Sequence, residues 1–390
     1  MGSASTMLIR PARISGRALG HTQRSQDFPS GASRPRAEGG LIEFLEPPKD
    51  RRPDSALRRI PPMMSEFQIE PIKGTGPRPF FSVVLPTYNR EKYFEEALCS
   101  VLTQTGIDDA EIIVMDNHSE LSDPESIVRR AADPRVQYVR QPVNIHGRNW
   151  VDGVRRTSGE WVHIMHDDDR LLSGFYTAYR DFIAGHPDVG MVFCRAMQID
   201  AEGKQLTPVL DPPGQNGTGR VEDALFKLAA GDYIVCPTAI VRRDVYEKLG
   251  CFNCNLLYAG DLEMWMRVAA AYPIGFIAET LVEYRTHGES SSLSEPLKYD
   301  VVEAIESAVE LGIALLPPER QAEARKALHW CLYQRAKISR QAAHIRGQHG
   351  KAVRYSEHAL RLNPSSKTMS RLWASRFIRM TRRRRPGDDF

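Results

Sequence analysis

The chain contains 390 residues, of which 42% are hydrophobic and 26% are charged. This length and composition suit one large globular domain or two ordinary ones, and they exclude a fibrous repeat and a chain that is disordered throughout. The net charge of +3 conceals an uneven distribution, because residues 1–79 carry a net charge of +5, residues 80–319 carry −16 and residues 320–390 carry +14.

Two further features of the composition bear on the compartment. No run of 18 apolar residues occurs, which argues against a membrane-spanning helix. The six cysteines are scattered, and the CxxC pair Cys251 and Cys254 has no second cysteine or histidine pair to complete a zinc site. A reducing cytosol is therefore the simpler setting, and we predict a cytoplasmic protein.

The first 75 residues have the composition of a segment that does not fold by itself. They are rich in arginine, proline, glycine and serine, and they contain few aromatic residues. Such a segment cannot bury enough apolar surface to offset the loss of chain entropy. We predict a disordered extension over residues 1–75 and an ordered domain that begins near Pro79.

Apolar runs alternate with helical patterns from residue 80 to residue 166. The first run, FFSVVLP, ends at a proline as expected of a buried parallel strand, and apolar residues then recur at helical spacing. Strands that alternate with helices predict an α/β fold with a parallel sheet. The predicted strands cover 80–86, 111–115, 136–141 and 161–166, and the predicted helices cover 91–104, 124–132 and 147–157.

Polar residues follow three of these strands, in the segments 86–90, 116–119 and 166–170. In parallel α/β sheets, ligands bind beyond the carboxyl ends of the strands. We therefore expect these three segments to meet and to form the functional site.

The pattern is less regular after residue 190. Here we predict helices over 220–230, 243–249 and 261–272, a strand over 281–285, and a helical region from about 300 to 362 with a break at 316–318. The segment 370–385 places large apolar residues among seven arginines, as in an amphipathic basic helix. The predicted organisation is a main domain over 79–300, a helical region over 301–369 and a basic amphipathic tail over 370–390.

The most specific local feature is HDDDR at residues 166–170. Three consecutive carboxylates repel one another, which costs stability at the end of an apolar strand unless a cation or a ligand network compensates. Hard divalent cations such as Mg²⁺ or Mn²⁺ prefer carboxylate oxygens and often hold a substrate phosphate as a further ligand. The alternative is a solvated acidic turn that caps a helix.

Three stretches, FSVVLPTYNREKYFEEALCSVLTQT, EIIVMDNHS and NIHGRNWVDGVRRTSGEWVHIMHDDDRL, occur in that order. With these motifs, roughly residues 80–290 resemble the family 2 glycosyltransferases of the GT-A fold. The resemblance implies a three-layer α/β/α domain with a mainly parallel central sheet, here followed by a helical C-terminal region. It also implies an inverting, metal-assisted transfer of a sugar from a nucleotide-sugar donor.

The resemblance assigns the donor site position by position. A tyrosine in the first loop can stack on a base, and an arginine can meet a diphosphate. The sequence departs from the family pattern at Asn117, where a second aspartate is frequent, and at His166, which occupies the first acidic position. The implied nucleotide-sugar-binding residues are Pro86, Thr87, Tyr88, Arg90, Asp116, Asn117, Gly147, Arg148, Asn149 and Asp167.

The resemblance also assigns the metal and the base. It implies that Asp168 binds Mn²⁺ or Mg²⁺, and that His287 ligates this metal or touches a phosphate. Asp261, in AGDLEMWMRV, is the implied catalytic base, with Glu263 as the alternative. A catalytic base must reach the acceptor hydroxyl. Two residues that are two positions apart on a helix point to different faces, so only one of the two can act as the base. Asp169 is expected to shape the acceptor side or to cap the next helix.

The implied substrates are a UDP-, GDP- or dTDP-linked sugar and a hydroxyl of a glycan or lipid-linked acceptor, in cell-surface polysaccharide synthesis. The basic tail suits an anionic membrane surface, and peripheral attachment to the inner face of the plasma membrane is expected through residues 370–385. One alternative is a nucleotide-sugar-binding protein that has lost catalysis. Another is a nucleic-acid-associated protein, but the net charge of −16 in the middle of the chain argues against nucleic acid.

Overall fold

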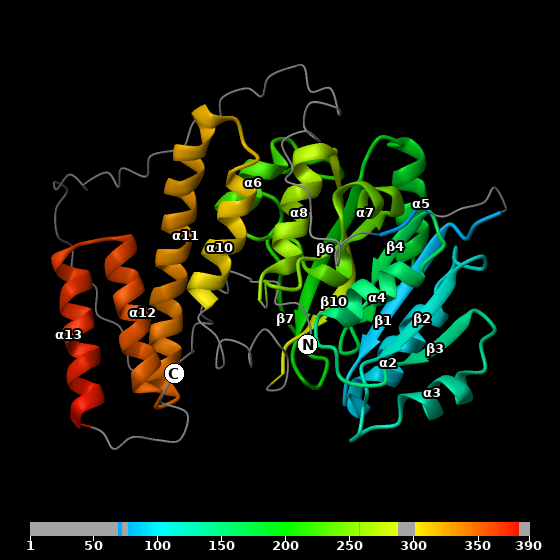
Figure 1. Ribbon diagram of the computed structural model, residues 1–390, viewed down its shortest axis with the longest axis horizontal. Helices are drawn as coiled ribbons and strands as arrows, with labels where there is room; N and C mark the ends of the chain where they lie inside the picture. The colour runs from blue at the N-terminus through cyan, green and yellow to red at the C-terminus, as the bar shows by residue number, and fades with distance from the viewer. Residues whose placement is uncertain (1–68, 72–76, 257, 288–300, 382–390) are drawn as a thin grey trace, which may run out of the picture.

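The computed structural model describes residues 69–71, 77–256, 258–287 and 301–381 (Figure 1). The disordered extension predicted for residues 1–75 lies outside these residues apart from 69–71. The segment 288–292, which ends the motif YRTHGESSS, also lies outside them, as does the end of the tail beyond residue 381.

The described strands form one mixed sheet. They are β1 (Phe81–Thr87), β2 (Glu111–Asp116), β3 (Val136–Arg140), β4 (Trp161–Ile164), β5 (Arg170–Leu171), β6 (Met191–Ile199), β7 (Gln205–Pro208), β8 (Gly219–Arg220), β9 (Ile240–Arg242) and β10 (Ile274–Arg285). The main path runs in the order β3-β2-β1-β4-β9-β6-β10-β5. The predicted parallel half is present, since β1 pairs in parallel with β2 and β4, and β2 with β3. Antiparallel β9 joins this half to the parallel pair β6 and β10.

Helices cover both faces of this sheet. One face packs against α2 (Glu91–Leu102), α3 (Pro124–Ala131) and α5 (Phe175–Gly185), and the other against α4 (Arg148–Arg156), α6 (Ala224–Ala230), α7 (Arg243–Leu249) and α8 (Gly260–Ala271). Val83 and Ile112 belong to the first core, and their neighbours Val84 and Ile113 belong to the second. Successive strand residues point to opposite faces, so a strand buried on both faces needs a continuous apolar run. The predicted three-layer α/β/α architecture is confirmed.

The C-terminal region is helical, as predicted. It comprises α10 (Val301–Ile313), α11 (Pro318–Ile345), α12 (His349–Leu362) and α13 (Ser366–Thr381). The predicted break lies between α10 and α11, where Pro318 begins α11 at the position that tolerates a missing backbone N–H. Apolar residues of α10, α11 and α12 belong to the same buried cluster as α8, so the helical region packs directly on the sheet domain. Among the helices of the described residues, none has the length and hydropathy needed to cross a membrane.

Several elements differ from the sequence prediction. The helix expected over 220–230 begins only at residue 224, and its first residue, Arg220, instead belongs to β8. Helix α5 and strands β6 and β9 were not predicted. The strand expected over 281–285 is the last part of a twelve-residue strand, β10, which ends at Arg285.

Candidate active site

The loops that follow β1, β2 and β4 meet at one edge of the sheet. The backbone N–H of Asn117 donates to the carbonyl of Thr87 at 2.9 Å. The backbone N–H of Tyr88 donates to Oδ2 of Asp167 at 3.4 Å. The predicted meeting of these three polar segments is therefore confirmed.

The acidic turn at 167–169 is partly neutralised by the protein itself. Arg90 lies with Nε 3.6 Å from Oδ1 of Asp167 and with Nη2 3.6 Å from Oδ2 of Asp168. Nε2 of His287 lies 3.0 Å from the same Oδ2 of Asp168. Two basic side chains thus reduce the repulsion that consecutive carboxylates create.

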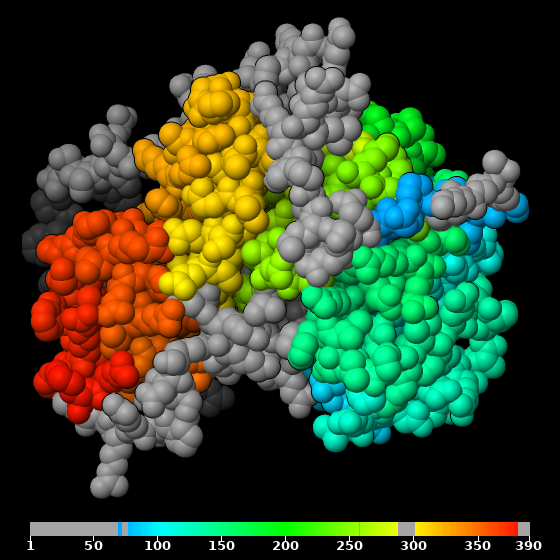
Figure 2. Space-filling model, viewed as in Figure 1, coloured from blue at the N-terminus to red at the C-terminus, as the bar shows by residue number. Residues whose placement is uncertain are grey.

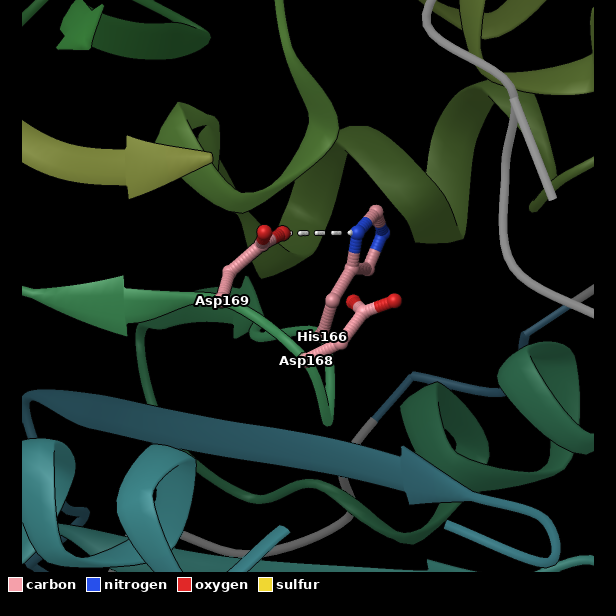
Figure 3. Close-up of side chains that lie close together, drawn as sticks. All are labelled: His166, Asp168 and Asp169. Carbon is pink, nitrogen blue, oxygen red and sulfur yellow. Dashed lines mark hydrogen bonds and ion pairs between the residues drawn. The ribbon is translucent and has the colours of Figure 1, made fainter. Parts of the chain in front are cut away.

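Asp169 is buried and accepts two hydrogen bonds. The backbone N–H of Arg285 donates to its Oδ1 at 2.6 Å, and Nδ1 of His166 lies 3.1 Å from its Oδ2 (Figure 3). The element that follows is the short strand β5, and Gly174 is the N-cap of the next helix, α5. The helix-capping prediction for Asp169 is therefore wrong, because this carboxylate instead fastens the acidic turn to the end of β10.

Arg285, the last residue of β10, is a positioning residue that the sequence analysis missed. Its Nε donates to the backbone carbonyl of Asp168 at 2.8 Å, and its Nη2 donates to Glu96 of α2. Its guanidinium lies 4.6 Å from the ring centre of Tyr93, and that ring lies 4.7 Å from the ring of His287. Arg285 therefore holds together β10, α2 and the acidic turn. The feature of the sequence that could have identified Arg285 is its position two residues before His287.

The acidic side chains differ in how easily they ionise. Burial disfavours charge on Asp168, but contacts with His287 and Arg90 outweigh it and lower the pKa of Asp168. Burial and the charge of Asp168 raise the pKa of Asp167, and the same two causes raise the pKa of Asp169 to about 6. Asp168 is therefore the most firmly ionised member of the turn, as a metal ligand must be.

The donor atoms near Asp168 fit a divalent cation. Within the described residues, His166, Asp168 and Asp169 place ligand atoms within 4.8 Å of one another, and Figure 3 shows these three side chains. The predicted pair of ligands is different, since it joins Asp168 to His287 rather than to His166. Asp169 already accepts two hydrogen bonds, and metal binding by Asp168 with His287 remains a prediction.

The predicted nucleotide residues of the first loop are split between the core and the surface. Pro86 and Thr87 are the last two residues of β1, and both are buried. Tyr88 is 39% exposed, and its stacking on a base remains a prediction. Arg90 keeps its guanidinium over the acidic turn, beside the expected diphosphate position.

The two polar residues that end β2 are engaged within the protein. Asp116 is fully buried and accepts hydrogen bonds from the hydroxyl of Tyr138 at 2.7 Å and from Nη1 of Arg140 at 3.1 Å. Asn117 accepts one from the backbone N–H of Ile145 at 2.9 Å. Both side chains therefore hold neighbouring backbone and side chains in place, and their contact with a base remains a prediction.

The third nucleotide block begins helix α4 and has one exposed member. Gly147 is the N-cap of α4, and the next residue, Arg148, is exposed to solvent. Asn149 is buried and donates from Nδ2 to the carbonyl of Met115 at 2.9 Å. Arg148 therefore lies at the surface of the protein, whereas Asn149 ties α4 to the end of β2.

The two candidate bases at the start of α8 have different surroundings. Glu263 forms a buried ion pair with Arg267, at 2.6 Å and 2.9 Å, and Arg267 also donates to the carbonyls of Leu249 and Cys251. This network occupies both carboxylate oxygens of Glu263, and the choice between the two bases remains a prediction. Asp261 lies in the first turn of α8 and is 2% exposed.

The buried pair gives a stability prediction. Glu263→Gln should lower the free energy of unfolding by about 3 kcal/mol, because it leaves the Arg267 charge buried without its counterion. Glu125→Gln is the matched control, since Glu125 and Arg129 form a pair with the same four-residue spacing on an exposed helix surface. This control should cost less than about 0.5 kcal/mol. Urea unfolding measures both, and equal midpoints for the two variants would contradict a structural role for Glu263.

The family comparison covers the part of the chain that contains the site. The family model described as Glycosyl transferase family 2 matches residues 82–250. This range includes the first two loops and the acidic turn. It ends before α8, which carries the predicted base Asp261, and before the end of β10.

Two relatives with related sequences are named as transferases of sugars. An uncharacterized glycosyltransferase, MJ1057 of Methanocaldococcus jannaschii, is 27% identical over 225 residues, which cover 57% of this chain and 76% of that protein. A 100-residue part of the chain is 38% identical to the GalNAc(5)-diNAcBac-PP-undecaprenol beta-1,3-glucosyltransferase of Campylobacter jejuni. This second match covers 25% of this chain and 32% of that protein.

The fold has solved counterparts. The crystal structure of S. aureus TarS 1–349 superimposes with a TM-score of 0.52 at 17% sequence identity, over 77% of this chain and 88% of that chain. The complex of the same TarS fragment with UDP-GlcNAc also has a TM-score of 0.52, at 18% identity. Residues 82–250 match the family 2 model and the relatives are named glycosyltransferases, so this part of the chain is a family 2 glycosyltransferase domain, and its GT-A architecture is the one seen in TarS.

Proposed function

We propose that this enzyme transfers a sugar from a nucleotide-sugar donor to a hydroxyl of a glycan or lipid-linked acceptor, with inversion at the anomeric carbon. The observation that carries the proposal is the joint placement of Asp168, His287 and Arg90 at the carboxyl edge of the sheet. An ionised carboxylate, an imidazole and a guanidinium around one point suit a diphosphate and its cation.

The donor site is built from the three converging loops and the start of α4. Tyr88 offers an exposed ring for the base, and Arg148 offers an exposed guanidinium for the ribose or diphosphate. Asp167, whose Oδ2 accepts from the backbone of Tyr88, would face the ribose. TarS was solved with UDP-GlcNAc, which makes a UDP-sugar the first donor to test, ahead of GDP- and dTDP-sugars.

Asp168 and His287 would hold the divalent cation, Mn²⁺ or Mg²⁺. When bound, such a cation supplies positive charge to the leaving diphosphate. Arg90 adds a fixed positive charge on the same side and shields the carboxylates of the turn from one another. Arg285 and Asp169 keep the turn in place through the contacts that join it to β10.

The transfer itself is a single displacement. The acceptor oxygen forms a bond to the anomeric carbon while the bond from that carbon to the diphosphate oxygen breaks, and the electron pair leaves with the diphosphate. Asp261 takes the proton of the acceptor hydroxyl. Asp261 lies in the first turn of α8.

The acceptor is proposed from a relative and from the charge of the chain. The Campylobacter jejuni relative is named for an undecaprenol diphosphate-linked acceptor. A lipid-linked acceptor lies at a membrane, and the strongly basic C-terminal segment 320–390 suits an anionic surface. We therefore propose that the enzyme works in cell-surface polysaccharide synthesis, in the cytoplasm and peripherally at the inner face of the plasma membrane.

Thermal unfolding with donors tests this function. The full chain should be stabilised by one class of nucleotide sugar in the presence of Mn²⁺, and less so without it. A donor at about 100 times its Kd adds about 2.7 kcal/mol to the free energy of unfolding. UDP-, GDP- and dTDP-sugars should be run as separate arms with and without metal. A shift that is accompanied by no transfer to any acceptor would favour a binding protein without catalysis, and no shift with any donor would contradict the proposal.

A further inference from the structure

Helix α13 carries a stripe of exposed apolar side chains. Met369, Trp373, Phe377 and Met380 are 42%, 62%, 62% and 77% exposed. Their spacing of four, four and three residues places them along one face of the helix. Single exposed apolar residues are common on protein surfaces, but four large ones in line on one helix mark an interaction surface.

The opposite face of α13 attaches the helix to the protein. Leu372 and Ser375 are buried, and the hydroxyl of Ser375 lies 2.9 Å from Nε2 of His344 on α11 and 3.0 Å from the hydroxyl of Ser356 on α12. In Figure 1, α13 is the outermost helix, at the end of the molecule opposite β2 and β3. In the space-filling view it forms part of that outer surface (Figure 2). The contacts of Ser375 therefore attach α13 to α11 and α12 on the side away from the stripe.

The charged residues of α13 are all basic. The helix contains Lys367, Arg371, Arg376 and Arg379 and no acidic residue, and the sequence continues with four arginines at 382–385. The guanidinium of Arg376 lies 5.8 Å from the ring centre of Trp373, at the border of the stripe. Large apolar side chains flanked by arginine and lysine are the pattern of a helix that lies in the interface of an anionic bilayer.

We propose that α13 binds the surface of an anionic lipid bilayer. The stripe enters the boundary between head groups and acyl chains, and the flanking basic side chains contact lipid phosphates. This proposal adds a membrane partner to the proposed function. The reason for the enzyme to bind a membrane rests on that function, whereas the binding surface follows from α13 alone. Attachment through this face would keep the enzyme beside a lipid-linked acceptor.

Two other occupants fit the same helix less well. Nucleic acid would be held by the basic residues, but phosphate contacts give no use for four exposed apolar side chains in a row. A second copy of the chain would bury the stripe, but it would bring the basic flanks of both helices together, and like charges repel. An anionic bilayer satisfies the apolar stripe and the charge at the same time.

Vesicle flotation of the full chain tests the proposal. The protein should float with vesicles of phosphatidylcholine that contain about 30% phosphatidylglycerol, and bind pure phosphatidylcholine at least about tenfold less. The double variant Trp373→Ser with Phe377→Ser should lose about tenfold or more in binding to the anionic vesicles. Lys367→Gln with Arg379→Gln should weaken binding to these vesicles and reduce its dependence on salt.

The control is Trp330→Ser on α11, because Trp330 is 63% exposed and so matches Trp373. It should leave vesicle binding unchanged, and an equal loss in this variant would overturn the assignment to the α13 stripe. Unchanged flotation of the double variant would overturn it too, as would binding to RNA or formation of a dimer in place of flotation. Donor-dependent thermal shift of the same samples separates the two proposals, since the double variant should keep the full shift.

Discussion

Asp168→Asn is expected to lower the rate of sugar transfer at least about 100-fold, which corresponds to about 2.7 kcal/mol of transition-state stabilisation. Asp168 is the one member of the acidic turn whose pKa is lowered, through contacts with His287 and Arg90 that outweigh its burial. An asparagine keeps the size of the side chain but removes the charge that a divalent cation needs. Initial rates with donor, acceptor and Mn²⁺ measure the effect.

Two comparisons distinguish a ligand from a structural carboxylate. Asp211→Asn removes a carboxylate that pairs with Arg195 on β6, and it should leave transfer close to the wild-type rate. In Asp168→Asn the thermal shift caused by Mn²⁺ with the donor should disappear, while the unliganded protein still unfolds cooperatively. Near-normal transfer by Asp168→Asn would show that the metal is held elsewhere or is not needed.

Asp261→Asn is the second change with a large expected effect, a fall in kcat of about 10²–10⁴ with donor binding retained. The amide keeps an oxygen for the hydrogen bond that Oδ1 accepts from the backbone N–H of Leu262. It cannot take up the proton of the acceptor hydroxyl. The measurement is kcat and the donor KM at saturating acceptor, together with the thermal shift caused by the donor.

The control for this second variant is Asp244→Asn. Asp244 also lies in the first turn of a helix, α7, and pairs there with Arg242 and Lys248. Asp244→Asn should be less stable than the wild type, but it should show no selective loss of kcat. If Asp261→Asn keeps its kcat, or if its donor shift disappears along with activity, the role of base does not belong to this residue.

The first half of the fold was predictable because its strands are buried on both faces. Such strands appear as continuous apolar runs, and β1 and β2 lie within one residue of the ranges expected from the sequence. The break before Pro318 was equally clear, because proline lacks a backbone N–H and favours the first turn of a helix. Helix α5 was missed although it is largely buried, because its aromatic residues have only moderate helix propensity.

The site was predictable to the extent that its residues follow the strand ends. Asp167, Asp168 and Arg90 lie at the edge where parallel strands place ligands, and their ion pairs join loops 77 or more residues apart in the sequence. The roles of Asp116 and Asn149 were not visible in the sequence. Both are buried among hydrogen-bonding partners, and such partners are set by packing.

The sequence by itself determined the alternation of strands and helices, the carboxyl-edge location of the site and the basic, amphipathic character of the last helix. These features depend on residue type and short-range spacing, which a linear pattern records. The tertiary structure alone decided that Arg285 supports the acidic turn, that Glu263 is held by Arg267, and that the stripe of α13 faces outward. These outcomes depend on which distant residues become neighbours, because burial and ion pairing act through space rather than along the chain.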